Sequence, residues 1–541
     1  MSTATEKDIV SSDNKTNLVL AGQKHDFEGF QSVLDPDDEG SQHLETLRKE
    51  YGSTWNGPDD PENPYNWPSW RKITIGVIFS LGQLVTLMSA SMIAAALGDI
   101  SRDLKIDDYT AQIIFSTYFL GLAIGPFVAA AFSEVTGRKG IWLFCNAWYI
   151  LWNALCPLGK SKALMITGRL MTGIGASGGI TVCINTKRPI PKSLLTDSRH
   201  FSKLTGPVMA DMYGKRERGK SLAIASFLPY LGPALGPIFG GIIAQLVVWP
   251  WIFWIMSIFN SFMTLAGYFF IRESYTPVLL RRKVKSEAEF ISNAERTFDA
   301  KYWQELFPQL SIGLARPFQI LIRRPVIQLI TFAFGVGFGI YTILISTFAT
   351  LYIERYNQTV SISALHYIAI AIGAIAASQI GGRIMDWLYR RLSKKNNNHG
   401  RPEFRVPYSM GGAILMPIGL FWYGWVAEVT GPWAVVDIGA SVFTLGNMVF
   451  SQGLLAYQLD EFGKYGASAN AASRVGSNIM GFILPIFGPQ LYDKLGFGWG
   501  NSLLGLIWIV SGGPICFLLY YWGERIRAIG RETEDEGSPR N

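Results

Sequence analysis

The feature that most constrains this chain is a series of long apolar segments without charged residues. Residues 73–97 and 503–522 contain no Lys, Arg, Asp or Glu. A helix needs about 20 apolar residues to cross a bilayer core of roughly 30 Å. Only 16% of the 541 residues are charged, against about 25% in a typical soluble domain. The sequence therefore predicts a membrane protein.

Twelve apolar segments are predicted to cross the membrane as helices. In lipid every backbone N–H and C=O must be paired inside the segment, which a helix achieves and an open strand does not. The predicted spans are 73–97, 110–131, 141–158, 163–182, 221–247, 251–271, 326–351, 363–388, 408–427, 433–457, 466–491 and 499–522.

A polar stretch divides the spans into two sets of six, so we expect an all-α membrane protein built as two six-helix bundles. Duplicated halves are typical of transporters with a site near the membrane midplane. The predicted organisation is a mostly disordered cytosolic tail (1–70), an N-terminal bundle (71–271), a cytosolic central loop (272–325), a C-terminal bundle (326–522) and a cytosolic tail (523–541).

The distribution of Lys and Arg predicts the orientation, because basic residues favour the cytosolic side. Both termini of this multi-pass protein are predicted to be cytosolic. We expect the plasma membrane, although the sequence does not separate it from the vacuole. The first span is expected to act as its own insertion signal, since the chain opens with polar residues. The basic residues of the predicted inner loops include Arg138, Lys139, Lys215, Arg216, Arg218, Lys220, Arg390, Arg391, Lys394, Lys395, Arg401 and Arg405, and those of the outer loops are Arg102, Lys105, Lys160, Lys162, Arg355 and Lys494.

Several classes of function are disfavoured by the sequence. The net charge of +7 comes mostly from short loops, and no basic module with aromatic residues predicts nucleic-acid binding. The glycines of 173–178 match G-x-G-x-x-G, but they lie in an apolar span and not after a strand. No metal cluster, catalytic set, cofactor site or ATP-binding P-loop is expected. An ion gradient is the simpler energy source.

Three motifs carry a family resemblance. They are Asp59–Pro68 before the first span, Leu231–Gly241 in the fifth, and Arg401–Pro407 before the ninth. They resemble motifs of the major facilitator superfamily, in its twelve-span fungal drug:proton antiporter-1 group, over about residues 55–525. The resemblance implies the fold of that superfamily and alternating access. It also implies proton-coupled antiport that exports drugs, toxins or secondary metabolites.

The glycines and prolines of the fifth span are expected to allow close helix approach and bending at a moving interface. Ordinary tight packing is the alternative explanation. The residues of this antiporter motif are Gly232, Pro233, Gly236, Pro237, Gly240 and Gly241.

A second set resembles the gating motif of the loop between spans two and three. An acidic residue, a turn glycine and two cations are expected to form a latch at the inner side. Plain membrane anchoring is the alternative, and Ala130 stands where the family usually has glycine. The residues are Glu134, Gly137, Arg138 and Lys139, with Asp386 at the corresponding place in the second half.

Arg169 and Asp437 are the candidates for proton coupling. Arg169 lies inside an apolar span, where a cation is costly unless paired or hydrated, and the resemblance assigns it a role in proton transfer. Pairing with backbone carbonyls is the structural alternative. Asp437 lies near the outer end of the tenth span, where the family often has proline. A solvated carboxylate at a helix end is the alternative there.

Polar and aromatic residues near the midplane are expected to line a substrate site, although each such residue alone more often serves packing or a hydrogen bond between helices. Deep carboxylates are nearly absent, which disfavours polycations and favours neutral or weakly acidic apolar compounds. The expected partners are a small-molecule substrate, protons and the lipid bilayer, with a monomeric chain. The candidate lining residues are Gln83, Tyr118, Tyr230, Asn260, Tyr341, Asn447 and Asn478.

Residues 183–204 are anomalous, because their charges and prolines interrupt an otherwise continuous fourth span. We expect either a retained intron in the coding sequence or a true cytosolic insertion. Two other functions stay open on the sequence alone. One is import of a small nutrient or polyamine by the same fold, and the other is a membrane sensor that transports nothing.

Overall fold

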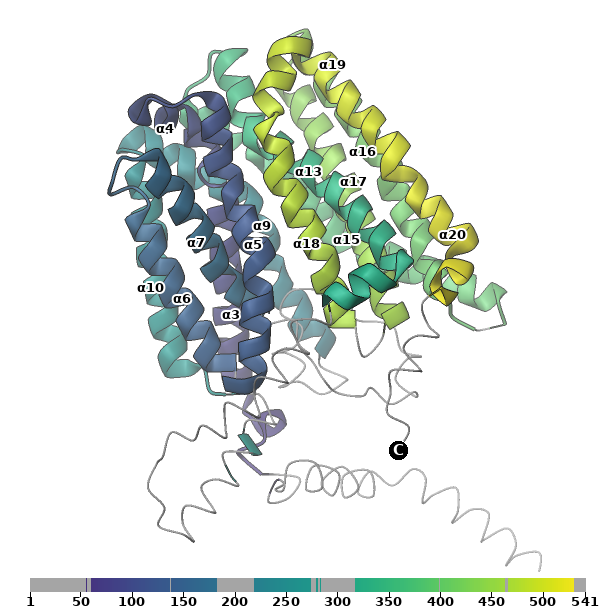
Figure 1. Cartoon of the computed structure of the whole chain (residues 1–541). Helices are drawn as coiled ribbons and strands as arrows, with labels where there is room; N and C mark the ends of the chain where they lie inside the picture. The colour runs from purple at the N-terminus through teal and green to yellow at the C-terminus, as the bar shows by residue number, and fades with distance from the viewer. Residues whose placement is uncertain are drawn as a thin grey trace, which may run out of the picture. The chain divides into compact units, whose positions relative to one another are not determined.

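The computed structural model is all-helical throughout the residues that it describes (Figure 1). Each of the twelve predicted spans overlaps a long helix in this part of the chain. By length and hydropathy, eight helical stretches of the described residues are suited to crossing a membrane. The described residues are 55, 60–136, 138–181, 218–273, 279–280, 283, 317–397, 399–462 and 466–529.

Six long helices form the N-terminal half. Helix α3 packs against α9, α5 against α7, and α6 against both α7 and α10. A 3₁₀ turn, η2 (Ala94–Ala96), and the short helix α4 (Leu97–Leu104) follow α3, which itself ends at Ser91, within the predicted first span. The long helices are α3 (Ser69–Ser91), α5 (Asp108–Thr136), α6 (Arg138–Leu155), α7 (Lys162–Thr181), α9 (Arg218–Leu246) and α10 (Pro250–Phe270).

The C-terminal half repeats this plan. Helix α16 packs against α17 and α19, α13 against α18, and α15 against α17. The short helix α14 (Val360–Leu365) precedes α15, and η4 (Pro402–Arg405) precedes α16. The long helices are α13 (Pro325–Glu354), α15 (Tyr367–Lys395), α16 (Val406–Glu428), α17 (Trp433–Phe462), α18 (Gly466–Ile486), α19 (Gly488–Ser511) and α20 (Gly513–Ala528).

The boundary between the last two spans lies inside α19. Gly496 has a φ of 70°, a left-handed conformation that glycine adopts without steric cost. A Cβ at this position would lie 2.7 Å from Glu428 Oε2. The chain therefore reverses at Gly496, and the rest of α19 continues with α20 as the twelfth span.

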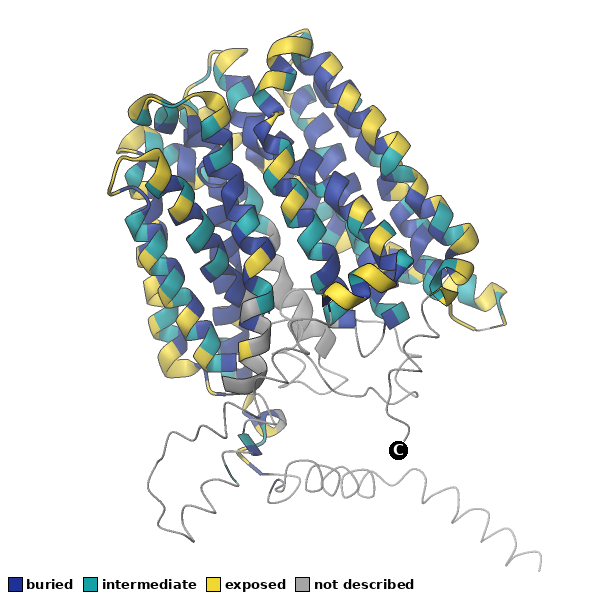
Figure 2. Cartoon of the chain, in the orientation of Figure 1, coloured by how far each residue is buried: buried dark blue, intermediate teal, exposed yellow. Residues whose placement is uncertain are grey.

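The halves contact each other through α5 with α18, and through α9 with α14 and α15. Buried residues gather on the inward faces of the helices, and exposed ones on the outside (Figure 2). The exposed side chains include large apolar ones such as Phe262 (64% exposed) and Val510 (77%). Such a surface fits a lipid environment.

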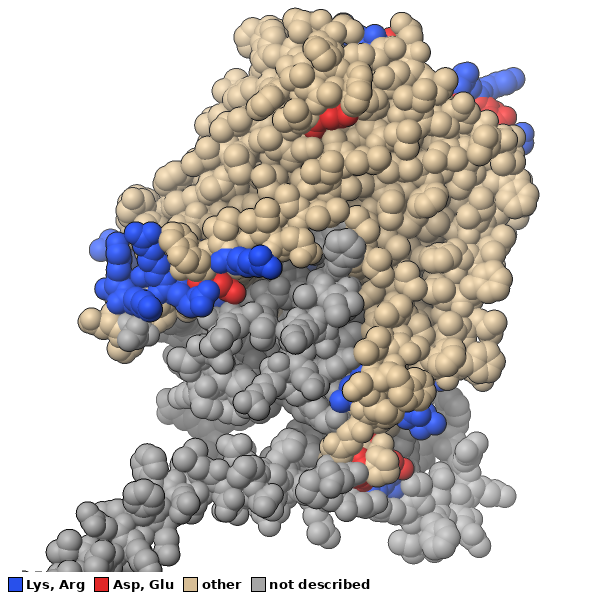
Figure 3. Space-filling view, turned by 180° about the vertical axis from the view of Figure 1, so that it is seen from behind, with Lys and Arg blue, Asp and Glu red and all other residues tan. Residues whose placement is uncertain are grey.

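Basic residues gather at one end of the C-terminal half. Figure 3 shows them as a blue group at the left, with a broad and mostly uncharged surface above. They lie on α15 and in the loop that follows it, at the end that the sequence predicts to be cytosolic. The exposed members are Arg383, Arg390, Arg391, Lys394, Lys395 and Arg401.

Described residues of the N-terminal tail and of the central loop form a small separate unit. Trp55 packs against Leu280, and Lys283 Nζ lies 3.8 Å from Asp60 Oδ2. Asp60 Oδ1 also accepts the Glu62 N–H at 2.9 Å, ahead of the 3₁₀ turn η1 (Pro64–Asn66). The tail motif is thus folded where it is described. Residues 1–54 and 56–59 lie outside the described part of the tail.

Candidate functional site

Arg169 is buried in the N-terminal half, at 1% exposure. Its Nη1 donates to the Ser89 carbonyl on α3 at 2.9 Å. Its guanidinium lies over the Tyr118 ring of α5, 4.5 Å from the centroid, a cation–π geometry. Nε and Nη2 have no hydrogen-bond partner, and no carboxylate pairs with Arg169 among the described residues. Pairing with backbone carbonyls was the structural alternative for Arg169. The Ser89 carbonyl accepts from only one of its three guanidinium nitrogens.

The hydroxyls around Arg169 fix α3 to its neighbours. Tyr118 donates to the Thr86 carbonyl at 2.9 Å, and the Tyr149 hydroxyl of α6 is hydrogen-bonded to the Ser89 hydroxyl. These tyrosines are buried, so Arg169 sits in a polar cluster enclosed by four helices. Tyr118 belongs to this cluster.

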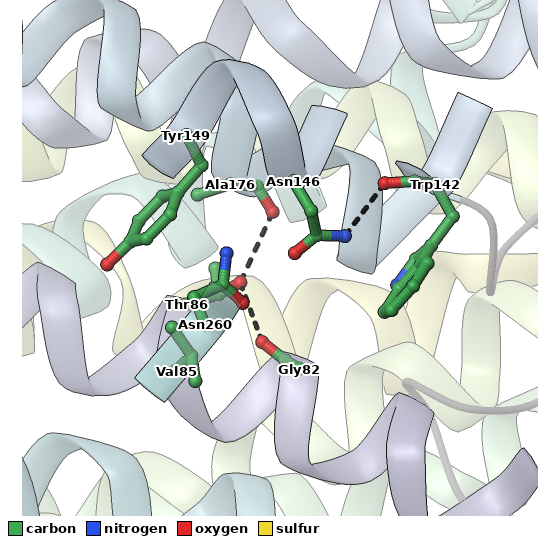
Figure 4. A pocket seen from close by; sticks show the side chains of 8 residues that line it. All are labelled: Gly82, Val85, Thr86, Trp142, Asn146, Tyr149, Ala176 and Asn260. Carbon is green, nitrogen blue, oxygen red and sulfur yellow. Dashed lines mark hydrogen bonds between the residues drawn. The ribbon is translucent and has the colours of Figure 1, made fainter. Parts of the chain in front are cut away.

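A small cavity lies between α3, α6, α7 and α10 (Figure 4). Its volume of about 10 Å³ holds roughly one water molecule and excludes a drug-sized compound. Thr86 Oγ1 lies between the carbonyls of Gly82, at 3.2 Å, and Ala176, at 3.3 Å. Asn260 Oδ1 is buried without a partner in the described residues. Of the seven predicted lining residues, Asn260 borders this cavity.

Aromatic side chains bridge the two halves. Phe119 of α5 lies 5.5 Å from Phe338 of α13, edge to face. Phe338 is followed by Tyr341 at 6.2 Å, and Tyr341 by Phe443 of α17 at 6.5 Å. The buried Tyr341 hydroxyl has no partner among the described residues. We call Phe119, Phe338, Tyr341 and Phe443 the aromatic bridge.

The predicted lining residues divide between the halves and do not converge on one described cavity. Tyr341 belongs to the aromatic bridge, and Asn478 Nδ2 crosses the halves to the Leu122 carbonyl at 3.0 Å. Gln83 and Asn447 are buried in opposite halves, and the Tyr230 side chain lies outside the described residues. The sequence missed Phe119 and Phe338, because an aromatic residue in an apolar span has no distinguishing signal.

The antiporter-motif glycines face two different neighbours. A Cβ at Gly232 would lie 2.5 Å from Leu87 Cβ on α3, and one at Gly240 would overlap the Met92 carbonyl. Gly241 instead faces α14, where a Cβ would lie 2.6 Å from Ala364 Cβ. Helix α9 therefore approaches both its own bundle and the opposite half without intervening side chains. Gly236 also faces α3, and Pro229, Pro233 and Pro237 lie inside α9.

Replacing Gly240 by alanine is expected to destabilise the protein by about 1–3 kcal/mol, because the added methyl meets a backbone carbonyl that cannot rotate away. Gly382→Ala in α15 is the matched control, since a Cβ there meets nothing within 4 Å. Thermal unfolding of the purified variants measures the difference. Equal melting temperatures would show that the close approach of α9 is not needed for stability.

Part of the gating motif is visible in the N-terminal half. The backbone N–H groups of Arg138 and Lys139 donate to the two Glu273 carboxylate oxygens, at 3.0 and 3.1 Å. Glu273 thus caps the first turn of α6, where a negative charge is favourable. The sequence missed this residue. Gly137 and the Glu134 side chain lie outside the described residues.

The corresponding end of the C-terminal half carries an ion-pair network. Arg405 is fully buried, with Nη1 3.2 Å from Asp386 Oδ1 and Nε 2.9 Å from Asp460 Oδ2. Arg527 pairs with Glu403 and Glu461, each at 2.7 Å. The predicted gating residue Asp386 therefore has a partner from the 401–407 motif. Asp460, missed from the sequence, completes the arrangement.

Asp437 lies in a cluster at the opposite end of this half. Its Oδ2 is 2.8 Å from His366 Nδ1, and its Oδ1 accepts the Tyr352 hydroxyl at 2.6 Å. His366 Nε2 lies 2.9 Å from Gln358 Oε1. The carboxylate is therefore engaged on both oxygens and is not simply solvated. The sequence named Asp437 alone, because His366 is distant along the chain.

Comparison with known families decides the class of protein. The sequence model of the Major Facilitator Superfamily matches residues 79–186 and 203–485. The chain belongs to the Major Facilitator Superfamily. The family and fold predicted from the motifs are thereby confirmed, and the protein is a membrane transporter rather than an enzyme.

Relatives and solved structures agree with this assignment. The chain is 34% identical over 482 residues to an uncharacterized transporter of Schizosaccharomyces pombe, covering 88% of this chain and 93% of that one. It is 32% identical over 479 residues to the efflux pump vrtL of Penicillium aethiopicum, with 88% and 90% covered. The xylose transporter XylE of E. coli, in a partially occluded inward-open conformation, superposes with a TM-score of 0.55 at 14% identity. That match covers 83% of this chain and 98% of XylE.

Proposed function

We propose that this transporter exports small, largely apolar molecules by alternating access, driven by protons moving inward. The observation that carries the proposal is Arg169, a buried cation with one backbone carbonyl and an aromatic face as its described partners. An incompletely compensated charge in a membrane protein is costly. Its free energy therefore changes when proton or substrate charges arrive nearby, which is what coupling requires.

The aromatic bridge supports an apolar substrate. Phe119, Phe338 and Phe443 offer ring surfaces, and the unpartnered Tyr341 hydroxyl offers a polar contact. Sites for small molecules commonly combine apolar walls with a few polar groups. Relatives that carry the name efflux pump favour export over import of a nutrient. We propose neutral or weakly acidic apolar compounds as the substrate class.

The proposed topology follows the charge distribution. The end with Arg390, Arg391, Lys394 and Lys395 faces the cytosol, and the end with α4 and α14 faces outward. Both termini are then cytosolic, in the plasma membrane, and the chain works as a monomer. In this topology the two bundles are residues 71–271 and 326–522, as proposed from the sequence.

We also propose that residues 183–204 are foreign to the transporter fold. They lie outside the described residues, after the end of α7 at Thr181. The family match skips residues 187–202 within this segment, as expected both for a retained intron and for a native insertion. Sequencing the mature transcript decides between the two, because a message that contains the segment would end the intron explanation.

The transport function is tested with purified protein in proteoliposomes that hold an imposed pH gradient. A radiolabelled azole and radiolabelled benzoate serve as neutral and weakly acidic probes, and an internal pH-sensitive dye reports proton flux. We expect a probe to move uphill as protons move the opposite way, with the movement lost when a protonophore is added. Absence of both probe and proton movement would contradict the proposal, and co-directional movement would favour an importer.

Replacing Phe338 by alanine is expected to raise the KM of the transported probe roughly 3- to 10-fold, the equivalent of one aromatic contact. Phe262→Ala removes a ring of the same size from the exposed surface of α10 and should leave the KM unchanged. The same vesicle assay measures both. If the two variants behave alike, the aromatic bridge does not contact substrate.

A further inference from the structure

The contacts of His366 fit a protonated imidazole that is paired with the Asp437 carboxylate. An imidazole with acceptors at both nitrogens carries two N–H groups and a positive charge. Here those acceptors are the Asp437 carboxylate and the Gln358 side-chain oxygen. His366 is 8% exposed, so the charge is shielded from water and compensated by Asp437. A neutral imidazole would keep the bond to Asp437 and would require the Gln358 amide to turn over.

Tyrosines are the titratable side chains that surround the pair in the described part of the chain. The Tyr352 ring of α13 stacks on the imidazole, with centroids 3.7 Å apart, and its hydroxyl donates to Asp437. Burial and the Asp437 carboxylate raise the pKa of Tyr356, whose hydroxyl donates to the Gly431 carbonyl. Tyr367 donates to the Ile345 carbonyl. Tyr423 of α16 is buried beside Phe348 of α13, and its hydroxyl has no hydrogen-bond partner among the described residues.

The charged side chains closest along the chain are otherwise engaged. Arg355 lies 3.8 Å from Glu428, and within the described residues neither forms an ion pair with His366 or Asp437. The faces of η2 and α14 contribute no charged side chain, and the outer turns of α9 contribute the neutral Gln245. Among the described residues, His366 and Asp437 are therefore paired with each other and not with another charged side chain.

His366 lies at the C-terminal end of α14, the short helix that contacts the N-terminal half. Helix α14 packs on α9 and η2 of the N-terminal half, and Gln245 of α9 accepts the Ser361 N–H at 2.9 Å. Ala364 lies against Gly241 of the antiporter motif. His366 follows at the C-terminal end of α14 and ties it to α13 and α17 through Tyr352 and Asp437. The proton-bearing pair thus anchors the element that joins the two halves.

We propose that His366 and Asp437 form a proton-binding site that holds α14 closed at the outer end of the transporter. The proposal rests on the proposed function for the orientation of this end. A proton that binds more tightly in the closed arrangement than in the open one favours closure below the midpoint of the transition. As the external pH rises, the imidazolium loses its charge, the ion pair with Asp437 is lost, and the open arrangement gains population.

This device suits an exporter that faces an acidic exterior. After releasing its cargo outward, the empty carrier must close the outer end before it can reload from the cytosol. A proton taken from outside by His366 favours that closing step. The proposed site thus lets external acid speed the return of the empty carrier, separately from any proton that crosses the membrane.

The test measures the outer opening directly and needs no substrate. Spin labels at R102C on α4 and V429C after α16, both exposed and in opposite halves, report their separation in lipid nanodiscs by pulsed electron resonance. The four cysteines of the sequence are replaced by alanine. Histidine side chains change charge between about pH 5 and 8, so spectra are taken from pH 4.5 to 8.5. We expect short separations at acid pH and a growing long-distance population as the pH rises.

Two variants and a control decide the outcome. His366→Gln should abolish the pH dependence, and Asp437→Asn should move its midpoint to lower pH by about one unit, a tenfold weaker hold on the proton. His399→Gln, in the exposed loop at the opposite end, should leave the profile unchanged. A pH-independent parent protein, or a His366→Gln profile like that of the parent, would overturn the proposal.

The result is separable from the transport test. If vesicles show proton-driven export while His366→Gln keeps the parental distances, the outer proton site is wrong and the proposed function stands. If no transport occurs but the pH-dependent opening is lost in His366→Gln, the site stands and the proposed function fails.

Discussion

Replacing Arg169 by methionine is expected to lower proton-driven transport roughly 10- to 100-fold without lowering stability. Methionine has a similar length and no charge, so it removes the charge-assisted bond to the Ser89 carbonyl, a contribution of about 1.5–3 kcal/mol. It also removes the cost of burying a cation that has no described counter-ion. The probe flux in proteoliposomes and the melting temperature of the same sample measure the two effects.

The control for Arg169 is Arg391→Met, at an exposed position in α15, which should change neither quantity. The combination of lost flux and retained melting temperature is the informative result. A normal flux in Arg169→Met would assign the arginine a structural role. A strongly lowered melting temperature would mean that its partial pairing, with Ser89 and Tyr118, holds the bundle together.

Replacing Arg405 by methionine is expected to destabilise the protein by about 3–5 kcal/mol, the cost of removing one partner from a buried ion pair. Asp386 and Asp460, which flank the buried guanidinium at 3.2 and 2.9 Å, would then face each other without a cation. Thermal unfolding in detergent, followed by tryptophan fluorescence, measures the loss. Because the Arg405 guanidinium is fully buried between two carboxylates, Arg405→Met is the substitution from which we expect the largest loss of stability.

Arg401→Met is the matched control for Arg405. Arg401 lies four residues away and also contacts a carboxylate, Glu524, at 3.1 Å, but the two side chains are 51% and 73% exposed. Exposed pairs contribute at most about 1 kcal/mol, so its melting temperature should stay close to that of the parent. Equal losses in Arg401→Met and Arg405→Met would show that burial does not set the strength of this network.

Local pattern was enough to predict the helices. A run of apolar residues long enough to cross a bilayer has one stable conformation in lipid, so segments such as 326–351 and 433–457 coincide with α13 and α17. The ends were less predictable. The chain kinks at Gly496 inside α19, and α3 ends at Ser91 within the predicted first span. Both features depend on contacts with other helices.

The candidate site was only partly predictable. Arg169 and Asp437 stand out because a charge in an apolar segment is rare. Their partners do not stand out: His366 is 71 residues from Asp437, and Asp460 is 55 residues from Arg405. In the sequence Phe338 cannot be distinguished from other apolar residues of its span, and only the structure shows its contact with Phe119. Side-chain partners come together through helix packing, which no local pattern encodes.

The sequence by itself determined that this chain spans a membrane as two sets of helices, carries a buried arginine and belongs with transporters. The helices and the rarity of buried charges follow from the lipid environment, in which backbone polar groups must be paired and charges are costly. The link to transporters follows from the motifs. Tertiary structure alone decided which side chains contact Asp437, which glycines let α9 approach α3 and α14, and which aromatic rings meet between the halves. Those outcomes depend on distances of a few ångströms between residues far apart in the chain, and only packing sets them.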